Sequence, residues 1–309
     1  MIETVHLRKE FGTKVAVHDL NLTVPLGRVT GLLGLNGAGK TTTIKILATL
    51  LRQTSGTVSV GGLDPVRQPR AVRRRINLIA GGERMVYARM TGRENLWYFG
   101  QLYDVPGRVL RPRVAELLDL VGLAEAADTR VERYSRGMAQ RLSIARGLVN
   151  DPDYLLLDEP TLGLDAPIAR DLRRVVAALA ERGKGVLLTS HYLAEVEQLC
   201  AHVYVIGDGR HLAEGTPAEL VAQSGCHRTV RVAVVELTPR VEAAARAFAP
   251  AVRIAPGGVV ELSGPGDVAG ALTSTIIEAG GALKGLEIAE PTLEDAILAL
   301  NDRPAAVIA

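Results

Sequence analysis

Short runs of apolar residues recur along the first two thirds of the chain, and stretches with helical spacing separate them. The runs are RVTGLLG (28–34), INLIA (76–80), YLLLD (154–158), GVLLTS (185–190) and VYVIG (203–207). Runs that are apolar on both faces and alternate with helices are typical of buried parallel strands. The opening strands, near 2–8 and 15–24, alternate apolar and polar residues, which indicates antiparallel pairing. The pattern therefore predicts an α/β sheet with an antiparallel β subdomain.

The segment between 80 and 154 has helical rather than strand character. Thr91 and Glu94 have the spacing of a capping box at the start of a helix. The stretch RPRVAELLDLVGL has helical period and ends at Gly122, a helix stop. We predict a helical subdomain over about 83–150. Its aromatic cluster at 97–99 (WYF) is either helix core, which we favour, or a docking surface.

After about residue 222 a second alternation of strands and helices begins. The expected strands are 229–237, 252–255, 258–264 and 283–290, and the expected helices are 239–249, 267–280 and 292–300. This alternation predicts a small α+β domain. We expect a first domain over 1–222 and a C-terminal domain over 228–303.

A phosphate-binding motif follows the first apolar run. The stretch GLNGAGKTT matches G-x-x-x-x-G-K-[ST] and lies between a strand and a helix, as the motif requires. Its glycines allow backbone N–H groups to form an anion nest, Lys40 would reach the β- and γ-phosphates, and the Thr41 hydroxyl would ligate Mg²⁺. The nucleotide-binding residues that we expect here are Gly34, Leu35, Asn36, Gly37, Ala38, Gly39, Lys40, Thr41 and Thr42.

Two carboxylates and a histidine follow other strands of the predicted sheet. The strand YLLLD ends in Asp158, which we expect to hold the Mg²⁺ shell, and Glu159 follows as a base that polarises water. His191 follows the strand GVLLTS, at the edge where open α/β sheets bind ligands. A neutral imidazole there can contact a γ-phosphate and hold the carboxylate. Glu159 and His191 are the expected catalytic residues.

Together these motifs resemble the ATP-binding-cassette (ABC) ATPases over roughly residues 2–220. The signature of that family, usually written LSGGQ, corresponds to YSRGM at 134–138. The resemblance implies that Ser135 and Gly137 bind the γ-phosphate of ATP held by the opposite subunit of a head-to-tail homodimer. It also implies that Phe11 stacks on adenine, with a core role as the alternative, and that Asp165 bridges the subunits.

Two positions depart from the family pattern. The family has a Gln near the end of the strand that corresponds to 76–80, and here Gly81 or Gly82 occupies that place. Either Glu83 substitutes for it or water completes the metal shell. The second departure is Arg136 where the signature has Gly; its guanidinium either adds a phosphate contact or points to solvent.

Composition limits the class of function. The net charge is only +2, so the chain lacks the strong positive charge that would indicate a nucleic-acid partner. Cys200 and Cys226 lack CxxC spacing and are read as incidental thiols. No stretch reaches the roughly 18 apolar residues of a membrane helix. We therefore expect a cytoplasmic chain that is held at the inner face of the membrane by a separate permease.

The C-terminal stretch EIAEPTLEDAILALN resembles the extension of ATPases that serve antibiotic and multidrug efflux. This implies an exporter subunit whose extension stabilises or regulates the dimer. An importer ATPase and a soluble ABC ATPase without transport function are the alternatives. The basic run 67–75 reads as a solvated helix face, with contact to anionic lipid as its alternative.

Overall fold

The computed structural model describes residues 1–81, 86–264 and 268–302. Contacts divide the chain into two compact units, Met1–Pro217 and Ala218–Ala309. The sequence placed the boundary slightly later, at 222–228, because the strand pattern restarts there. The two boundaries differ in where they place helix α8 (Pro217–Ser224), because all of this helix except Pro217 belongs to the second unit.

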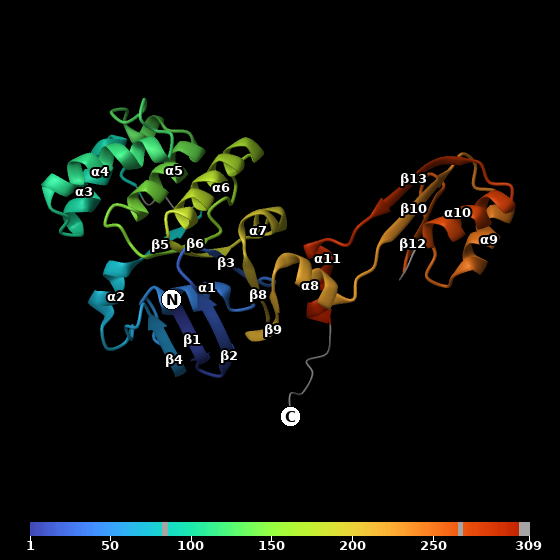
Figure 1. The fold of residues 1–309 in the computed structure, drawn as a ribbon, viewed down its shortest axis with the longest axis horizontal. Coiled ribbons are helices and arrows are strands. Elements are labelled where there is room, and N and C mark those ends of the chain that lie inside the picture. Colours follow the sequence, from blue (N-terminus) through green and yellow to red (C-terminus); the bar gives the residue numbers. More distant parts are fainter. Residues whose placement is uncertain (82–85, 265–267, 303–309) are drawn as a thin grey trace. The chain divides into compact units, whose positions relative to one another are not determined.

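The first unit is built on a nine-stranded sheet with the order β4-β1-β2-β9-β8-β3-β7-β6-β5 (Figure 1). Its strands are β1 (Ile2–Phe11), β2 (Lys14–Val24), β3 (Val29–Leu33), β4 (Ser55–Val60), β5 (Ile76–Ala80), β6 (Tyr154–Asp158), β7 (Gly185–Thr189), β8 (His202–Gly207) and β9 (Arg210–Gly215). Strands β5, β6, β7, β3 and β8 pair in parallel, whereas β1 pairs antiparallel with β2 and β4. The predicted α/β sheet and its antiparallel subdomain are both confirmed.

The helices of the first unit fall into a group around the sheet and a group inserted between β5 and β6 (Figure 1). The first group is α1 (Lys40–Leu47), α2 (Pro69–Arg75), α6 (Ala166–Glu181) and α7 (Leu193–Leu199); the inserted group is α3 (Gly92–Leu102), α4 (Gly107–Leu120), a 3₁₀ turn (Val131–Arg133) and α5 (Arg136–Gly147). The Thr91–Glu94 capping box is present at the start of α3. Gly122, with φ +64°, follows the end of α4 as predicted.

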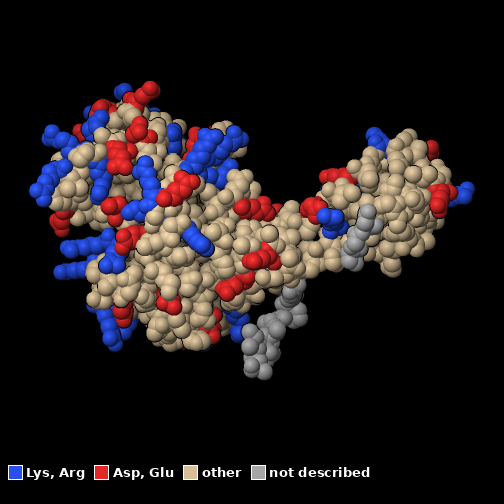
Figure 2. Space-filling model, in the orientation of Figure 1, with Lys and Arg blue, Asp and Glu red and all other residues tan. Residues whose placement is uncertain are grey.

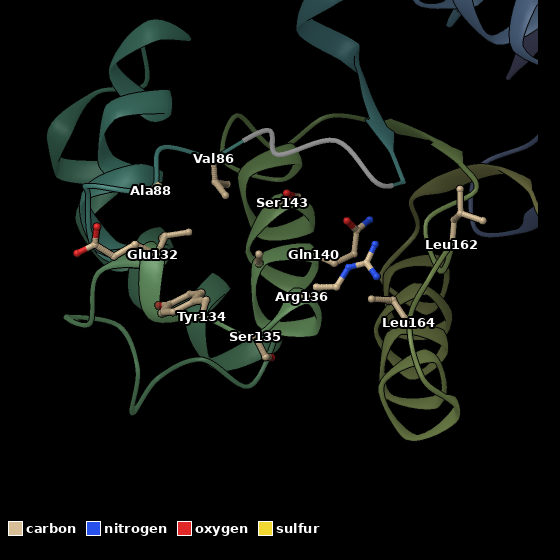
Figure 3. A pocket seen from close by; sticks show the side chains of 12 residues that line it. Val86, Ala88, Glu132, Tyr134, Ser135, Arg136, Gln140, Ser143, Leu162 and Leu164 are labelled. Carbon is tan, nitrogen blue, oxygen red and sulfur yellow. The ribbon is translucent and has the colours of Figure 1, made fainter.

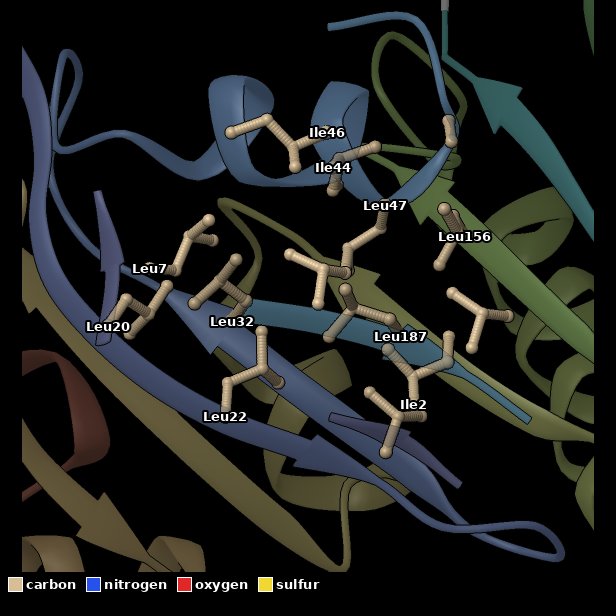
Figure 4. Packing of buried hydrophobic residues seen from close by; sticks show 14 of the residues in the cluster. Ile2, Leu7, Leu20, Leu22, Leu32, Ile44, Ile46, Leu47, Leu156 and Leu187 are labelled. Atoms are coloured by element: carbon tan, nitrogen blue, oxygen red, sulfur yellow. The ribbon is translucent and has the colours of Figure 1, made fainter. Parts of the chain in front are cut away.

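The core of the first unit lies between α1 and the sheet (Figure 4). Leu32 of β3, Leu156 of β6 and Leu187 of β7 are fully buried there, and Leu47 of α1 packs on them. Burying a side chain of this size contributes about 1.5–3 kcal/mol. This packing anchors the strands whose carboxyl ends carry the site.

The second unit contains a four-stranded antiparallel sheet with the order β11-β12-β10-β13. Its elements are α8 as above, β10 (Thr229–Val234), α9 (Pro239–Phe248), β11 (Arg253–Ala255), β12 (Val259–Ser263), α10 (Val268–Glu278), β13 (Leu283–Ala289) and α11 (Leu293–Asp302). From β10 to β13 the connectivity is the β-α-β-β-α-β arrangement of ferredoxin-like folds. Val232, Val260 and Leu272 lie fully buried in a core of its own. The small α+β domain is therefore confirmed.

Two surface features of the first unit bear on the sequence predictions. Trp97 and Tyr98 are 37% and 38% exposed, so the helix-core interpretation of this cluster is wrong for both. The reason is helix geometry: α3 buries the face that carries Asn95, Leu96 and Gly100 instead. Helix α2 exposes its arginines and buries Val72, as both a solvated face and contact with anionic lipid require. Basic side chains gather along this part of the unit (Figure 2).

Both cysteines are free thiols. Cys200 is buried, and burial together with the charge of Glu195 raises its pKa to about 12, so its reactive thiolate form is rare near neutral pH. Among the helices of the described residues, none combines the length and the apolar character needed to cross a membrane.

Candidate functional site

The phosphate loop and the two candidate catalytic segments meet at one edge of the large sheet. Strand β7 lies between β3 and β6, and all three are parallel. Their carboxyl ends lead into the loop at 34–39, into Asp158 and Glu159, and into the segment Thr189–His191. Open α/β sheets bind ligands at such an edge.

The phosphate loop requires glycine at two close approaches to neighbouring backbone. A Cβ on Gly34 would lie 2.0 Å from the Ile206 carbonyl oxygen, and one on Gly39 would lie 2.6 Å from that of Ala16. Gly39 also has φ +103°, a backbone conformation that favours glycine. The loop therefore wraps tightly against β2 and β8 before α1 begins at Lys40.

Lys40 is the buried cation of this loop. Its Nζ donates hydrogen bonds to the carbonyl oxygens of Gly34 and Leu35, at 2.6 and 3.1 Å. Burial lowers the pKa of Lys40, while the negative charges of Glu159 and Asp158 act in the opposite direction. Lys40 and both carboxylates follow strands of the same parallel edge, and their charges interact. Thr41, exposed on the first turn of α1, adds a hydroxyl at the same loop.

Asp158 and Glu159 have separate partners on the neighbouring segment. The Thr189 hydroxyl donates to Oδ1 of Asp158 at 2.6 Å. Nε2 of His191 lies 2.7 Å from Oε1 of Glu159. Glu159 has φ +52°, an unusual conformation for a non-glycine residue and one that concentrates at functional sites. The predicted pair of Glu159 and His191 is thus brought together.

The end of β5 packs against the backbone of the same two residues, Asp158 and Glu159. The N–H of Gly81 donates to the Asp158 carbonyl oxygen at 2.7 Å, and a Cβ on Gly81 would lie 1.8 Å from the carbonyl oxygen of Glu159. A glutamine therefore has no room at position 81. Gly82 and Glu83, the other two residues considered for the family's Gln, lie outside the described residues.

The signature segment forms the start of α5, against the start of α6. Ser135 is the N-cap of α5: its exposed hydroxyl accepts from the N–H of Met138 at 3.2 Å. A Cβ on Gly137 would lie 2.5 Å from a side-chain carbon of Ile168, so glycine permits this helix contact. The N-terminus of α5 presents a hydroxyl and a helix dipole, two features of an anion site.

Arg136 is exposed, and its guanidinium also lies near a loop of its own chain; a phosphate contact stays a prediction. A Cβ on Gly163 would lie 3.1 Å from Nη2 of Arg136 and 3.4 Å from its Cζ, so the guanidinium lies against the loop that follows Glu159. Figure 3 shows its side chain reaching from α5 toward Leu162 and Leu164, beside Gln140. Arg136 therefore contacts its own chain.

Two further candidates, Phe11 and Asp165, are exposed. Phe11 is 47% exposed, with Nζ of Lys9 4.7 Å from the ring centroid, so its alternative role in the core is wrong. Its stacking on adenine stays a prediction. Asp165 is exposed and caps α6, where its Oδ1 accepts from the Ile168 N–H at 3.2 Å. Its role between subunits also stays a prediction.

Sequence reasoning missed Thr189 and Glu195. Thr189 ends β7 two residues before His191, so its place at the carboxyl edge of the sheet was an available signal. Glu195 is a buried carboxylate on α7, and its partners come from segments that the sequence pattern does not bring together.

Comparisons with known proteins agree with this geometry. The family model described as "ABC transporter" matches residues 17–162. The chain is 45% identical over 242 residues to the daunorubicin/doxorubicin resistance ATP-binding protein DrrA of Streptomyces peucetius, covering 78% of this chain and 73% of that protein. It is 42% identical over 200 residues to the ABC transporter ATP-binding protein NatA of Bacillus subtilis (strain 168), covering 65% and 81%.

Two further matches extend the likeness. The linearmycin resistance ATP-binding protein LnrL of Bacillus subtilis (strain 168) is 32% identical over 311 residues, 98% of this chain and 99% of that protein. A solved structure of an ATP-binding subunit of an ABC transporter superposes with a TM-score of 0.66 at 28% identity, covering 73% of this chain and 93% of that one.

The fold and the site define a nucleotide-binding α/β ATPase with a helical insertion. The chain belongs to the ABC transporter family, as an ATP-binding subunit that hydrolyses ATP. Resistance and export are the roles stated in the names of its relatives, which include a Nod factor export protein of Burkholderia lata. The alternatives of an importer subunit and of a soluble ABC ATPase without transport function are not supported.

Proposed function

We propose that this chain powers the efflux of a drug, an antibiotic or a lipid-like small molecule through a separate membrane permease. The observation that carries the ATPase part is the Glu159–His191 pair, 2.7 Å apart, in the site shared with Lys40. Daunorubicin/doxorubicin and linearmycin resistance proteins among its relatives support the class of cargo.

The phosphate loop holds ATP and, with β6, one Mg²⁺ ion. Lys40 exchanges its two carbonyl contacts for phosphate oxygens, and the amides of the glycine-rich loop bind the same phosphates. The Thr41 hydroxyl and the Asp158 carboxylate are hard oxygen ligands of the kind that Mg²⁺ prefers, and they would hold the ion. The ion neutralises negative charge on the phosphates.

Hydrolysis depends on Glu159. Its carboxylate accepts a proton from the water that attacks the γ-phosphorus, a role worth about 10²–10⁴ in rate. His191 holds Oε1 of that carboxylate through Nε2, which fixes its orientation toward the phosphates. The Thr189 hydroxyl orients Asp158 in the same way.

A second chain completes each site. The Ser135 hydroxyl, the Gly137 N–H and the dipole of α5 bind the γ-phosphate held by the partner subunit, while Asp165 bridges the two subunits. Each chain gives the same surface to the other, as a twofold homodimer requires. The exposure of Ser135 and Asp165 supports this arrangement.

The helical insertion is the proposed contact to the permease, which would place the chain at the inner face of the membrane. Tyr87, Tyr98 and Phe99 form a cluster of aromatic rings with centroids 5.2–5.8 Å apart. Tyr98 of this cluster and its sequence neighbour Trp97 are partly exposed. Partly exposed aromatic residues are enriched at protein interfaces. For the C-terminal unit we propose that it stabilises or regulates the dimer.

Two substitutions separate ATP binding by one chain from the contribution of the partner chain to hydrolysis. We expect Lys40→Ala to weaken ATP binding by the monomer, because it removes the buried cation from the phosphate loop. We expect Ser135→Ala to leave monomer binding within about twofold and to lower hydrolysis by about 10²-fold, a loss typical of one phosphate-oxygen donor. Binding of a fluorescent ATP analogue and steady-state phosphate release measure the two effects.

The matched control is Ser55→Ala, an exposed serine of β4 in the first unit. It should change neither quantity. If Ser135→Ala weakens monomer binding as much as Lys40→Ala does, the proposed role of the signature across the interface is wrong.

A further inference from the structure

A buried carboxylate lies behind the candidate catalytic pair and has no role in the mechanism above. Glu195 of α7 is 1% exposed. An ionised group at such depth is costly unless it is paired and hydrogen-bonded. Its partners are two hydroxyls and one guanidinium, from three different segments of the first unit.

Oxygen Oε2 of Glu195 joins the two segments that carry the catalytic pair. It accepts hydrogen bonds from the hydroxyl of Thr161 at 2.9 Å and from that of Ser190 at 2.8 Å. Thr161 lies two residues after Glu159, and Ser190 comes directly before His191. Both hydroxyl residues are themselves buried. One carboxylate oxygen therefore ties the loop after β6 to the segment after β7.

We call the contacts of Glu195 with Thr161 and Ser190 the clamp. The other oxygen of Glu195 connects this clamp to helix α6. Oε1 of Glu195 lies 3.4 Å from Nη1 of Arg173, whose side chain is 21% exposed. Helix α6 begins just after the loop that contains Thr161. Arg173 thus balances the buried charge of Glu195. It lies on the helix that follows the loop to which Glu195 is hydrogen-bonded.

We propose that Glu195 is a positioning residue for ATP hydrolysis, one that fixes the segments of Glu159 and His191 relative to each other. It touches neither nucleotide nor water and acts through Thr161 and Ser190. The 2.7 Å contact between His191 and Glu159 depends on both segments being held in this register. This inference rests on the catalytic roles proposed above for those two residues.

The chemistry of the clamp requires a carboxylate rather than an amide. Two hydroxyls and a guanidinium all donate toward Glu195, and a carboxylate is acceptor-only. A glutamine has the same shape, but its NH₂ group would face either the Arg173 guanidinium or the two hydroxyls, which would then have to turn from donors into acceptors. Glu195→Gln therefore keeps the packing, removes the negative charge that Arg173 balances, and either loses the Arg173 contact or reverses the hydroxyl contacts.

The experiment measures turnover and nucleotide affinity in the purified full-length chain. We expect Glu195→Gln to lower kcat roughly tenfold to a hundredfold, the cost of a small misplacement of catalytic groups. The Kd for ATP should stay within about twofold, because the phosphate loop is untouched. Ser190→Ala should lower kcat by a smaller factor. The double variant should be no slower than Glu195→Gln alone, because both act through one contact.

Leu22→Ala is the control for lost stability. Leu22 is a fully buried core residue of β2, so its truncation lowers the melting temperature without touching the clamp. Its kcat, measured well below that temperature, should match the unmodified chain. The proposal is wrong if Glu195→Gln keeps kcat within twofold, or if its loss and that of Ser190→Ala simply multiply.

Glu159→Gln separates this proposal from the one it rests on. Normal turnover in that variant would remove the base assignment itself. Lost turnover in Glu159→Gln together with unchanged kcat in Glu195→Gln would overturn only the positioning role.

Discussion

Single residues set the geometry of this site through contacts that bridge distant parts of the chain. His191 reaches Glu159 from the next strand of the sheet, and Glu195 ties both segments from behind. The positive φ of Glu159 turns its side chain out of the strand direction at the point where β6 ends. We expect the loss of any one of these contacts to change the orientation of Glu159 or His191 more than it changes the fold.

Gly163 offers a test of the Arg136 contact. Its φ of +73° strains a residue that carries a side chain, and Nη2 of Arg136 lies 3.1 Å from where a Cβ would stand. Gly163→Ala should destabilise the first unit by about 1–2 kcal/mol from the backbone conformation alone. In the unmodified chain the total loss of unfolding free energy should be larger than this backbone contribution, because the end of the Arg136 side chain must also shift to admit the methyl group.

Urea unfolding of four chains measures the two contributions. These are the unmodified chain, Gly163→Ala, Arg136→Gly and the double variant. The cost of Gly163→Ala should be smaller in the Arg136→Gly background, where only the backbone strain is left. An equal cost in both backgrounds would show that Arg136 does not lie against this loop.

Elements that depend on local signals were predictable from the sequence, and those that depend on tertiary contacts were not. The capping box at Thr91 and the phosphate loop are encoded within a few neighbouring residues. The exposure of Trp97 depends on which face of α3 packs inward. The sequence of α3 mixes apolar and polar residues, so its periodicity does not identify that face. Thr161 and Glu195 are 34 residues apart in the sequence and become neighbours only through the order of the strands.

The capping box gives a prediction for the stability of the helical insertion. Thr91 accepts from the Glu94 N–H at 3.1 Å, and its own N–H donates to Oε2 of Glu94 at 2.8 Å. Thr91→Ala should lower the free energy of unfolding by about 1 kcal/mol, the usual cost of losing an N-cap. Thr57→Ala, at an exposed position of β4, is the matched control and should cost less than about 0.5 kcal/mol.

Trp97, the only tryptophan of the chain, lies on the same helix and reports its unfolding by fluorescence. Equal shifts of that transition in the two threonine variants would contradict the stabilising role of the cap.

At the scale of the whole molecule, the chain separates into an ATPase unit and a smaller unit with its own core. Family membership rests on the first unit, which carries the residues matched by the family model. The likeness to the linearmycin resistance protein spans both units. This combination supports a subunit whose catalytic part is general to the family and whose second unit is shared with some of its relatives.

The central claim is that two chains close on ATP and that Glu159 then drives hydrolysis. The most direct measurement is the mass in solution of purified Glu159→Gln by sedimentation, without nucleotide and with Mg²⁺ plus either ATP or ADP. With ATP we predict a species of twice the 32.9 kDa of one chain, together with turnover reduced by about 10²–10⁴. ADP should leave the chain monomeric, because it lacks the γ-phosphate that Ser135 would bind. A variant that binds ATP but stays monomeric, or one that hydrolyses ATP at the normal rate, would contradict the account.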